Sequence, residues 1–317
     1  MEASAQGDKA AAALAGGVAA GRRSDRARAV TALESGGAPA GALVAALKPH
    51  LTGITVAGLT GPPGAGKSTL TNALLKAWRS QGLRIAVIAV DPSSPVSGGA
   101  ILGDRIRMDA AIDDDGIFVR SLASAGHLGG LSPAAVRIVD AFDAAGFDLV
   151  LIETVGTGQN EVDIAAVSDV CTVVAAPGLG DGIQAMKSGL IEIADILVVN
   201  KADRPEARTT AEQLAAAVSL RASGSRAPAI IETSATLGNG VTELAGTILT
   251  LGAEAAAASG LAARRARRAR YIVERQAIAA VQAALDARSP AAAGIIEAVL
   301  AGTLDARDAA RRLLEAD

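Results

Sequence analysis

The sequence predicts an α/β fold in which a mainly parallel central sheet is flanked by helices, with further helices at both ends of the chain. Short apolar runs rich in β-branched residues alternate with Ala- and Leu-rich helical stretches, as in a parallel sheet. The runs are apolar throughout, which is typical of strands covered on both faces. The expected strands are Ile54–Leu59, Arg84–Val90, Ile117–Ser121, Phe147–Ile152, Val170–Ala176, Ile196–Val199 and Ala229–Glu232.

The 317 residues divide into three predicted parts. Residues 1–48 are expected to form an N-terminal tail and a helical extension, with about the first 20 residues poorly ordered. Residues 49–252 form the α/β domain. Residues 253–317 form a helical C-terminal arm of two or three helices, broken at Ser289-Pro290 and near Gly302.

Composition excludes several kinds of protein. Half of the residues are hydrophobic but only 2% are aromatic, so the core must consist of Ala, Val, Leu and Ile. The net charge of −3 gives no global basic field for nucleic acid. The single cysteine, Cys171, excludes an intramolecular disulfide and lies in an apolar run, where a buried strand residue is expected. No uninterrupted apolar run suits a bilayer, and the N-terminal charge order does not suit a secretory signal, so we expect a cytoplasmic protein.

A phosphate-binding loop follows the first predicted strand. Its residues are Gly61, Pro62, Pro63, Gly64, Ala65, Gly66, Lys67, Ser68 and Thr69, which match G-x-x-x-x-G-K-[ST]. Lys67 is expected to reach the β- and γ-phosphates, and the Ser68 hydroxyl is expected to bind Mg²⁺. The helix predicted over Leu70–Trp78 adds the positive end of its dipole. The loop alone predicts nucleotide binding without saying which nucleotide.

A second loop selects the base. Asn200-Lys201-Ala202-Asp203 follows the strand Ile196–Val199 and matches N-K-x-D. The Asp203 carboxylate can accept hydrogen bonds from guanine N1–H and the exocyclic amine, whereas adenine offers no such pair of donors. Ser234-Ala235 follows the last predicted strand, and a backbone N–H there is expected to contact guanine O6. The combination favours GTP over ATP.

Three carboxylates are candidates for the catalytic and Mg²⁺ positions. Glu153 opens Glu153-Thr154-Val155-Gly156 at a strand end, where it can hold Mg²⁺ directly or through water while the Gly156 N–H senses the γ-phosphate. Asp91 follows another strand, and Asp104 lies in the segment after it. Asp104 could also orient the attacking water, or simply cap a helix. Phosphoryl transfer needs mainly positioning and charge neutralisation, so Lys67, Asp104 and Glu153 are the expected catalytic residues.

Taken together, these motifs resemble the MeaB/MMAA/ArgK family of SIMIBI-class P-loop G-proteins, the chaperones of cobalamin-dependent acyl-CoA mutases. The resemblance covers roughly residues 50–245 and is carried by several blocks. These are GLTGPPGAGKSTL, AVDPSSPVSGGAILGDRIRM, GHLGGLS, ETVGTGQNEVDIA, APGLGDGIQAMKSG, EIADILVVNKAD and ETSATLGNGV.

The resemblance implies a homodimeric GTPase that uses GTP/GDP and Mg²⁺ and couples its nucleotide state to a mutase. In the family, a segment like Pro177–Gly189 acts as an additional switch, which here would use Asp181, Gln184 and Lys187. The chain departs from many relatives at Gly182, where they carry an acidic residue, and at Ala125, where they carry Arg. Methylmalonyl-CoA mutase is the default client, and isobutyryl- and hydroxyisobutyryl-CoA mutases stay open.

Other features favour this interpretation over the alternatives. A metallochaperone-type GTPase for another metalloenzyme would need His- or Cys-rich motifs, and the chain has two histidines and one cysteine. A P-loop small-molecule kinase is disfavoured by the N-K-x-D loop. His127 is expected to have a structural or switch-coupled role, and the cobalamin-anchoring pattern D-x-H-x-x-G is absent, so the partner would carry cobalamin.

Two further expectations concern turnover and the basic run in the C-terminal arm. No glutamine directly follows Gly156, and Gln159 lies three residues beyond it, so intrinsic hydrolysis is expected to be slow and stimulated by a partner. The run Arg264–Arg270 is expected to be a solvated helix face, helped by Glu274 four residues after Arg270, rather than a nucleic-acid site.

Overall fold

The computed structural model describes residues 2–91, 114–123, 131–154, 160–178, 189–220, 226–286 and 290–315. The chain separates into two compact units, Met1–Arg267 and Arg268–Asp317. The domain boundary predicted between residues 252 and 253 falls inside one long helix of the structure, and the predicted boundaries remain predictions.

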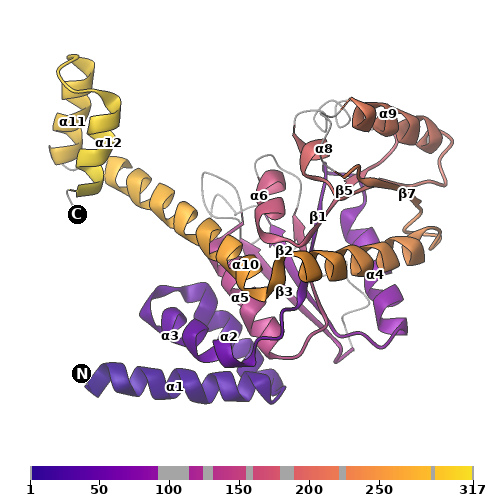
Figure 1. The fold of residues 1–317 in the computed structure, drawn as a ribbon, viewed down its shortest axis with the longest axis horizontal. Coiled ribbons are helices and arrows are strands. Elements are labelled where there is room, and N and C mark those ends of the chain that lie inside the picture. Colours follow the sequence, from indigo (N-terminus) through magenta and orange to yellow (C-terminus); the bar gives the residue numbers. More distant parts are fainter. Residues whose placement is uncertain are drawn as a thin grey trace. The chain divides into compact units, whose positions relative to one another are not determined.

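In the described part of the chain, the first unit is built on a seven-stranded parallel sheet with the order β3-β2-β4-β1-β5-β6-β7 (Figure 1). This confirms the predicted fold class, and each predicted strand is present to within two residues at either end. The strands are β1 Thr55–Thr60, β2 Ile85–Asp91, β3 Ile117–Ala123, β4 Leu149–Thr154, β5 Val170–Ala175, β6 Ile196–Asn200 and β7 Ala229–Thr233.

The described helices of the first unit are α1 Glu2–Ala19, α2 Arg23–Ser35, α3 Gly37–Leu47, the short 3₁₀ helix η1 Lys48–His50, α4 Lys67–Ser80, α5 Pro133–Ala144, α6 Asn160–Val167, α8 Leu190–Ile193 and α9 Ala207–Ser219. Helix α10 Val241–Asp286 begins in the first unit and ends in the second, which also contains α11 Pro290–Leu300 and α12 Ala306–Glu315. The expected breaks at Ser289-Pro290 and near Gly302 are confirmed. An interruption at Gly260, where φ is 67° and ψ is 164°, was not expected.

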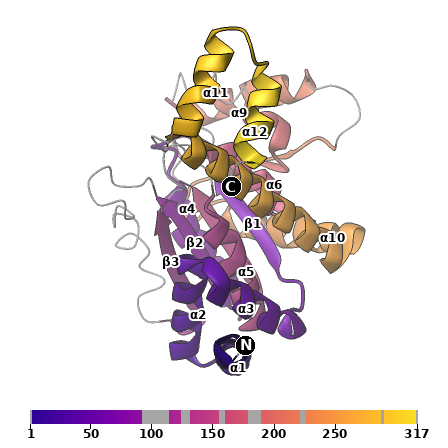
Figure 2. The same ribbon diagram turned by 90° about the vertical axis from the view of Figure 1, so that its left-hand side faces the viewer.

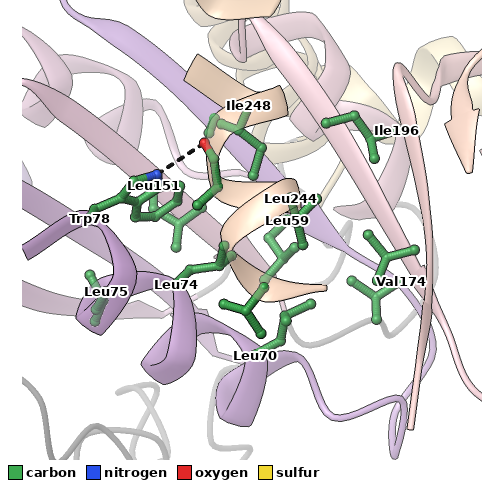
Figure 3. Packing of buried hydrophobic residues seen from close by; sticks show 14 of the residues in the cluster. Leu59, Leu70, Leu74, Leu75, Trp78, Leu151, Val174, Ile196, Leu244 and Ile248 are labelled. Atoms are coloured by element: carbon green, nitrogen blue, oxygen red, sulfur yellow. Dashed lines mark hydrogen bonds between the residues drawn. The ribbon is translucent and has the colours of Figure 1, made fainter. Parts of the chain in front are cut away.

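The main core lies between the sheet and the helices α4 and α10. Leu70, Leu74 and Trp78 of α4 meet Leu244 and Ile248 of α10 over the strand residues (Figure 3). The indole N–H of Trp78 donates to the carbonyl of Ala245 at 3.2 Å. The other members of this buried cluster are Ala, Val, Leu and Ile, as the composition predicts.

The first 20 residues were expected to be poorly ordered, and that expectation is wrong. Residues 2–19 form α1, which packs against α2 and α3 at one end of the first unit (Figure 2). Ala11, Ala15 and Val18 of α1 are buried. Small side chains permit this close approach: a Cβ on Gly17 would lie 2.0 Å from Oδ2 of Asp25. An Ala/Gly-rich sequence with weak hydrophobicity therefore still forms a packed helix.

One described segment, Val241–Leu285 of α10, is long and apolar enough to cross a membrane by length and composition alone. Its apolar residues Val241, Leu244 and Ile248 are buried in the core beside the sheet. Burial in the domain core accounts for these three side chains, whereas only 22% of the apolar window is buried.

The run Arg264–Arg270 was expected to be a solvated helix face, and this expectation is wrong for the beginning of the run. The Arg264 side chain is 4% exposed and donates to Asp169 Oδ2 at 3.0 Å and to the carbonyl of Gly53 at 2.8 Å. Arg267 donates to the other Asp169 oxygen at 3.0 Å. Asp169 itself accepts the backbone N–H of Val56, in β1, at 3.0 Å. These arginines therefore fasten α10 to the strand starts, whereas Arg270 does form the expected exposed pair with its neighbour four residues on.

Candidate nucleotide site

The sheet order brings the predicted site residues to one edge. The phosphate loop begins after β1, which lies between β4 and β5. Glu153 lies near the end of β4, opposite Leu59 of β1 in the register. Asn200 ends β6, and Ser234 follows β7. In parallel sheets ligands bind at the carboxyl ends of the strands, and this edge therefore carries the candidate site.

Glycines shape the phosphate loop by allowing two close approaches. Gly61 has a φ of 139°, and a Cβ there would lie 2.2 Å from the carbonyl oxygen of Val174 in β5. Gly66 has a φ of 87°, and a Cβ would lie 2.5 Å from Nδ2 of Asn200. The first turn of α4 starts directly afterwards at Lys67. The loop thus combines a left-handed backbone with a helix N-terminus, an arrangement suited to phosphate.

The ammonium of Lys67 lies inside this loop. Nζ donates to the carbonyls of Gly61 at 2.7 Å and Pro62 at 3.0 Å, and the residue is buried. When a nucleotide binds, the Lys67 ammonium can exchange these two neutral carbonyls for negatively charged phosphate oxygens, which form stronger hydrogen bonds with it. The position fits the role that the motif predicts.

Glu153 connects strand β4 to helix α4. It is buried, and its Oε1 accepts the Ser68 hydroxyl at 2.8 Å while Oε2 accepts the Thr71 hydroxyl at 2.7 Å. Hydroxyl and carboxylate oxygens are the hard ligands that Mg²⁺ prefers, so the donor set of Ser68 and Glu153 fits this ion. Thr71 was missed from the sequence, although it lies three residues after Ser68 and therefore on the same helix face.

The N-K-x-D loop is tied directly to the phosphate loop. Asn200 Nδ2 donates to the carbonyl of Ala65 at 2.9 Å, and Lys201 Nζ donates to the carbonyl of Gly64 at 2.7 Å. Lys201 has a φ of 59°, an uncommon conformation for a residue other than glycine. This backbone bend and the two hydrogen bonds hold the base-reading loop beside the phosphate-binding loop.

Hydrogen bonds from the end of β7 hold Asn200 and Asp203. Asn200 Oδ1 accepts the Thr233 hydroxyl and the Ala235 N–H, both at 3.2 Å. The buried Ser234 donates its hydroxyl to Asp203 Oδ1 at 2.6 Å. This hydrogen bond is the main reason that the pKa of the exposed Asp203 carboxyl lies below its ordinary value, so the carboxylate form is favoured.

The backbone N–H groups expected to contact guanine O6 already have partners. The Ser234 N–H donates to the carbonyl of Asn239 at 2.9 Å, and the Ala235 N–H donates to Asn200. A base carbonyl at this position would therefore share the Ala235 N–H with Asn200. Thr233, whose hydroxyl supports Asn200, is a further residue that the sequence argument missed.

Several predicted residues fall outside what the structure describes. Asp91 ends β2, where its backbone pairs with Ala123, but its side chain is not among the described ones. The others lie outside the described residues altogether: Asp104, Ala125, His127, Gly156, Gln159, Asp181, Gly182, Gln184 and Lys187. Cys171 is confirmed as a buried strand residue, and burial raises the pKa of its thiol.

The chain is similar to a known protein family, to individual relatives and to a solved structure. The family model described as "Methylmalonyl Co-A mutase-associated GTPase MeaB" matches residues 26–290. A Pyrococcus abyssi protein is 45% identical over 228 residues, which are 71% of this chain and 70% of that protein. The Mus musculus "Methylmalonic aciduria type A homolog, mitochondrial" is 39% identical over 213 residues, or 66% of this chain and 51% of that protein. A crystal structure of LAO/AO transport system kinase has a TM-score of 0.72 at 28% identity and covers 96% of both chains.

Proposed function

This chain belongs to the MeaB family of methylmalonyl Co-A mutase-associated GTPases, and from that premise we propose that its GTP cycle assists a cobalamin-dependent acyl-CoA mutase. The proposed assistance is loading, protection or reactivation of the mutase's cofactor. Methylmalonyl-CoA mutase is the first candidate for the client. The description of the family and the name of the mouse relative support this choice.

One observation carries the nucleotide part of the proposal. The N-K-x-D loop and the phosphate loop are joined by hydrogen bonds from Asn200 and Lys201 to the backbone at Ala65 and Gly64. Either motif alone occurs in sites with several functions. The N-K-x-D loop, whose Asp203 can bind guanine, is fixed beside a phosphate-binding loop, and this combination fits guanine nucleotides. A guanine nucleotide spans both elements, with its base at Asp203 and its phosphates in the loop.

We assign the chemistry of the phosphate end to Lys67, Ser68 and Glu153. The Lys67 ammonium would leave the carbonyls of Gly61 and Pro62 for the β- and γ-phosphates and offset the charge that develops there. Mg²⁺ held by Ser68 and Glu153 would neutralise further phosphate charge. Both carboxylate oxygens of Glu153 already accept hydroxyl protons, an arrangement suited to holding a metal rather than to accepting a proton from water.

This assignment of Glu153 supports slow turnover by the isolated protein. Among the described residues of the site, the Glu153 carboxylate accepts the Ser68 and Thr71 hydroxyls, and these hydrogen bonds point to a binding role. Positioning of the attacking water then depends on a group elsewhere or on the client. Hydrolysis is therefore expected to be slow alone and faster with the mutase.

We also propose a homodimer that uses the C-terminal arm. Large apolar side chains are exposed on the second compact unit, including Val273 at 66%, Leu285 at 43% and Leu300 at 82%. Apolar side chains gathered on one helical unit support an interface there. Light scattering of the purified protein tests the dimer: a monomer at micromolar concentration would contradict it.

Co-purification with candidate mutases tests the proposed function. The tagged protein is loaded with a non-hydrolysable GTP analogue or with GDP and mixed with methylmalonyl-CoA mutase or isobutyryl-CoA mutase. We expect one mutase to be retained, to an extent that depends on the nucleotide, and we expect Lys67→Ala to lose that dependence. Lys76→Ala, on the exposed face of the same helix, should behave as the wild type. Retention of neither mutase in either nucleotide state would overturn the proposal.

A further inference from the structure

A hollow of about 680 Å³ lies at the edge of the sheet opposite the phosphate loop. Arg84 and Gly116 line it directly before β2 and β3, Arg79 lines it from the last turn of α4, and Arg23 and Arg26 line it from the start of α2. These are the amino ends of the strands, whereas the nucleotide site lies at their carboxyl ends. We call this feature the arginine hollow.

Carboxylates balance only part of the positive charge in the arginine hollow. Arg23 pairs with Asp115 at 3.3 Å, and Arg79 pairs with Asp114 at 2.7 Å. Arg84 donates its Nη1 to the carbonyls of Gly146 and Ala145, at 2.8 and 3.3 Å, and these carbonyls carry no net charge. The nearby Asp148 accepts the backbone N–H of Arg84 at 2.7 Å rather than its guanidinium.

Among the residues that the structure describes, none forms a hydrogen bond or ion pair with the Arg26 guanidinium. The residue is 8% exposed, and its Nε is fully buried without a partner. The guanidinium carbon lies 5.4 Å from the ring centroid of Phe147 and 5.9 Å from that of Phe118. Burial, and then the charges of Arg84 and Arg23, lower the pKa of Arg26, and the charge of Asp115 only partly offsets them. A buried cation that no described carboxylate contacts directly is costly, so an anion bound to its guanidinium would stabilise it.

Aromatic packing holds the two uncompensated guanidiniums in place. Arg84 lies over the same Phe147 ring as Arg26, with its guanidinium carbon 4.9 Å from the centroid. Phe118, Phe142 and Phe147 pack together beneath them, with centroids 5.4 to 6.4 Å apart. These are the three phenylalanines of the chain. Two arginines fixed on one ring form a prearranged pair of donors.

We propose that the arginine hollow binds a phosphate group, either free or at the end of a small phosphomonoester, independently of the nucleotide. Guanidinium forks match the paired oxygens of phosphate. Arg26 and Arg84 form no ion pair with a described carboxylate, and two such cations suit the charge of about −1.5 to −2 that a phosphomonoester carries at pH 7. A carboxylate would balance only half of this charge.

Calorimetry on protein saturated with a non-hydrolysable GTP analogue tests the proposal, because the analogue fills every phosphate position of the loop. Inorganic phosphate, glycerol phosphate and acetate are titrated separately. We expect one site for inorganic phosphate, and binding of glycerol phosphate as well would identify the ligand class as a phosphomonoester. Arg26→Gln should weaken binding about tenfold or more, because a hydrogen-bonded charge is removed. Arg28→Gln, two residues along the same helix, should bind as the wild type does.

A second measurement covers the case in which Arg26→Gln does not fold. In the wild-type protein, the NMR signal of the Arg26 Nε–H should shift on addition of phosphate, and that of Arg28 should not. The proposal is overturned if phosphate does not bind, if Arg26→Gln binds it equally, or if acetate binds as tightly as phosphate. None of these results bears on the GTPase site.

Discussion

The two edges of the parallel sheet hold their charged groups by different means. At the carboxyl edge, the Lys67 and Lys201 ammonium groups donate to carbonyls of the phosphate loop. At the amino edge, Arg264 is enclosed by Asp169 and by strand-start carbonyls. Arg26, at the same edge, has an aromatic ring beneath it, and no carboxylate of the described residues hydrogen-bonds to its guanidinium.

This contrast indicates which charged side chains are available to a ligand. A lysine that donates to neutral carbonyls can exchange them for a ligand at a modest cost in free energy. An arginine paired with a buried carboxylate cannot, because breaking the pair would leave a buried charge without its partner. By this criterion Lys67 is a ligand-binding residue, whereas Arg264 stabilises the fold. Arg26 is buried like Arg264, yet no described carboxylate pairs with it directly, as in a binding residue.

Replacement of Lys67 should give the largest effect. Lys67→Ala is expected to lower the rate of GTP hydrolysis by a factor of about 10³, which nearly abolishes it, because the substitution removes the main protein charge at the phosphates. Phosphate release measures the rate, and circular dichroism checks the fold. Lys76→Ala on the same helix is the control. If Lys67→Ala hydrolyses GTP at the wild-type rate, Lys67 does not act on the nucleotide phosphates.

Replacement of Arg264 should affect stability rather than turnover. Arg264→Ala leaves the buried Asp169 with fewer donors, and the free energy of unfolding is expected to fall by about 3 kcal/mol. Urea denaturation followed by circular dichroism measures the change. Arg270→Ala removes an exposed pair and should cost about 0.5 kcal/mol or less. Equal losses in the two variants would show that burial does not distinguish these arginines.

The smallest expected effect concerns Ser234. In the wild type, the lowered pKa of Asp203 means that the stability contributed by its carboxylate is complete above the ordinary pKa and is lost as the pH falls through the lowered value. Ser234→Ala removes the largest cause of this shift, so the pKa should move up toward the ordinary value of about 3.9. NMR titration of the carboxyl carbon measures it. Ser234→Thr should retain the wild-type value, and identical midpoints for wild type and Ser234→Ala would rule out this cause.

The carboxyl edge could be predicted from the sequence because its signals are local. A strand run, a glycine-rich loop and a helix follow one another around Gly61–Thr69, and Asn200–Asp203 follows its strand in the same way. Strand order and register then bring these loops together without further information. Thr71 and Thr233 could not be singled out, since a threonine near a motif has many ordinary roles.

The amino edge depends on contacts that no local pattern indicates. Arg264 bonds Gly53, 211 residues away, and Asp169, 95 residues away. A run of arginines on a helix gives the same sequence signal whether it is solvated or buried. The N-terminal helix α1 was missed for a related reason: alanine and glycine give little hydrophobic signal, but their small size allows close helix packing.

Equilibrium binding of GTP and xanthosine triphosphate to Asp203→Asn tests most directly the claim that the carboxyl edge reads guanine. GTP binding is expected to weaken about 10- to 100-fold, because hydrogen bonds to a charged acceptor are lost. Xanthosine triphosphate should bind the variant more tightly than it binds the wild type, since an amide can donate to the xanthine carbonyl. Unchanged GTP affinity in calorimetry, with xanthosine triphosphate still rejected, would contradict the assignment of Asp203.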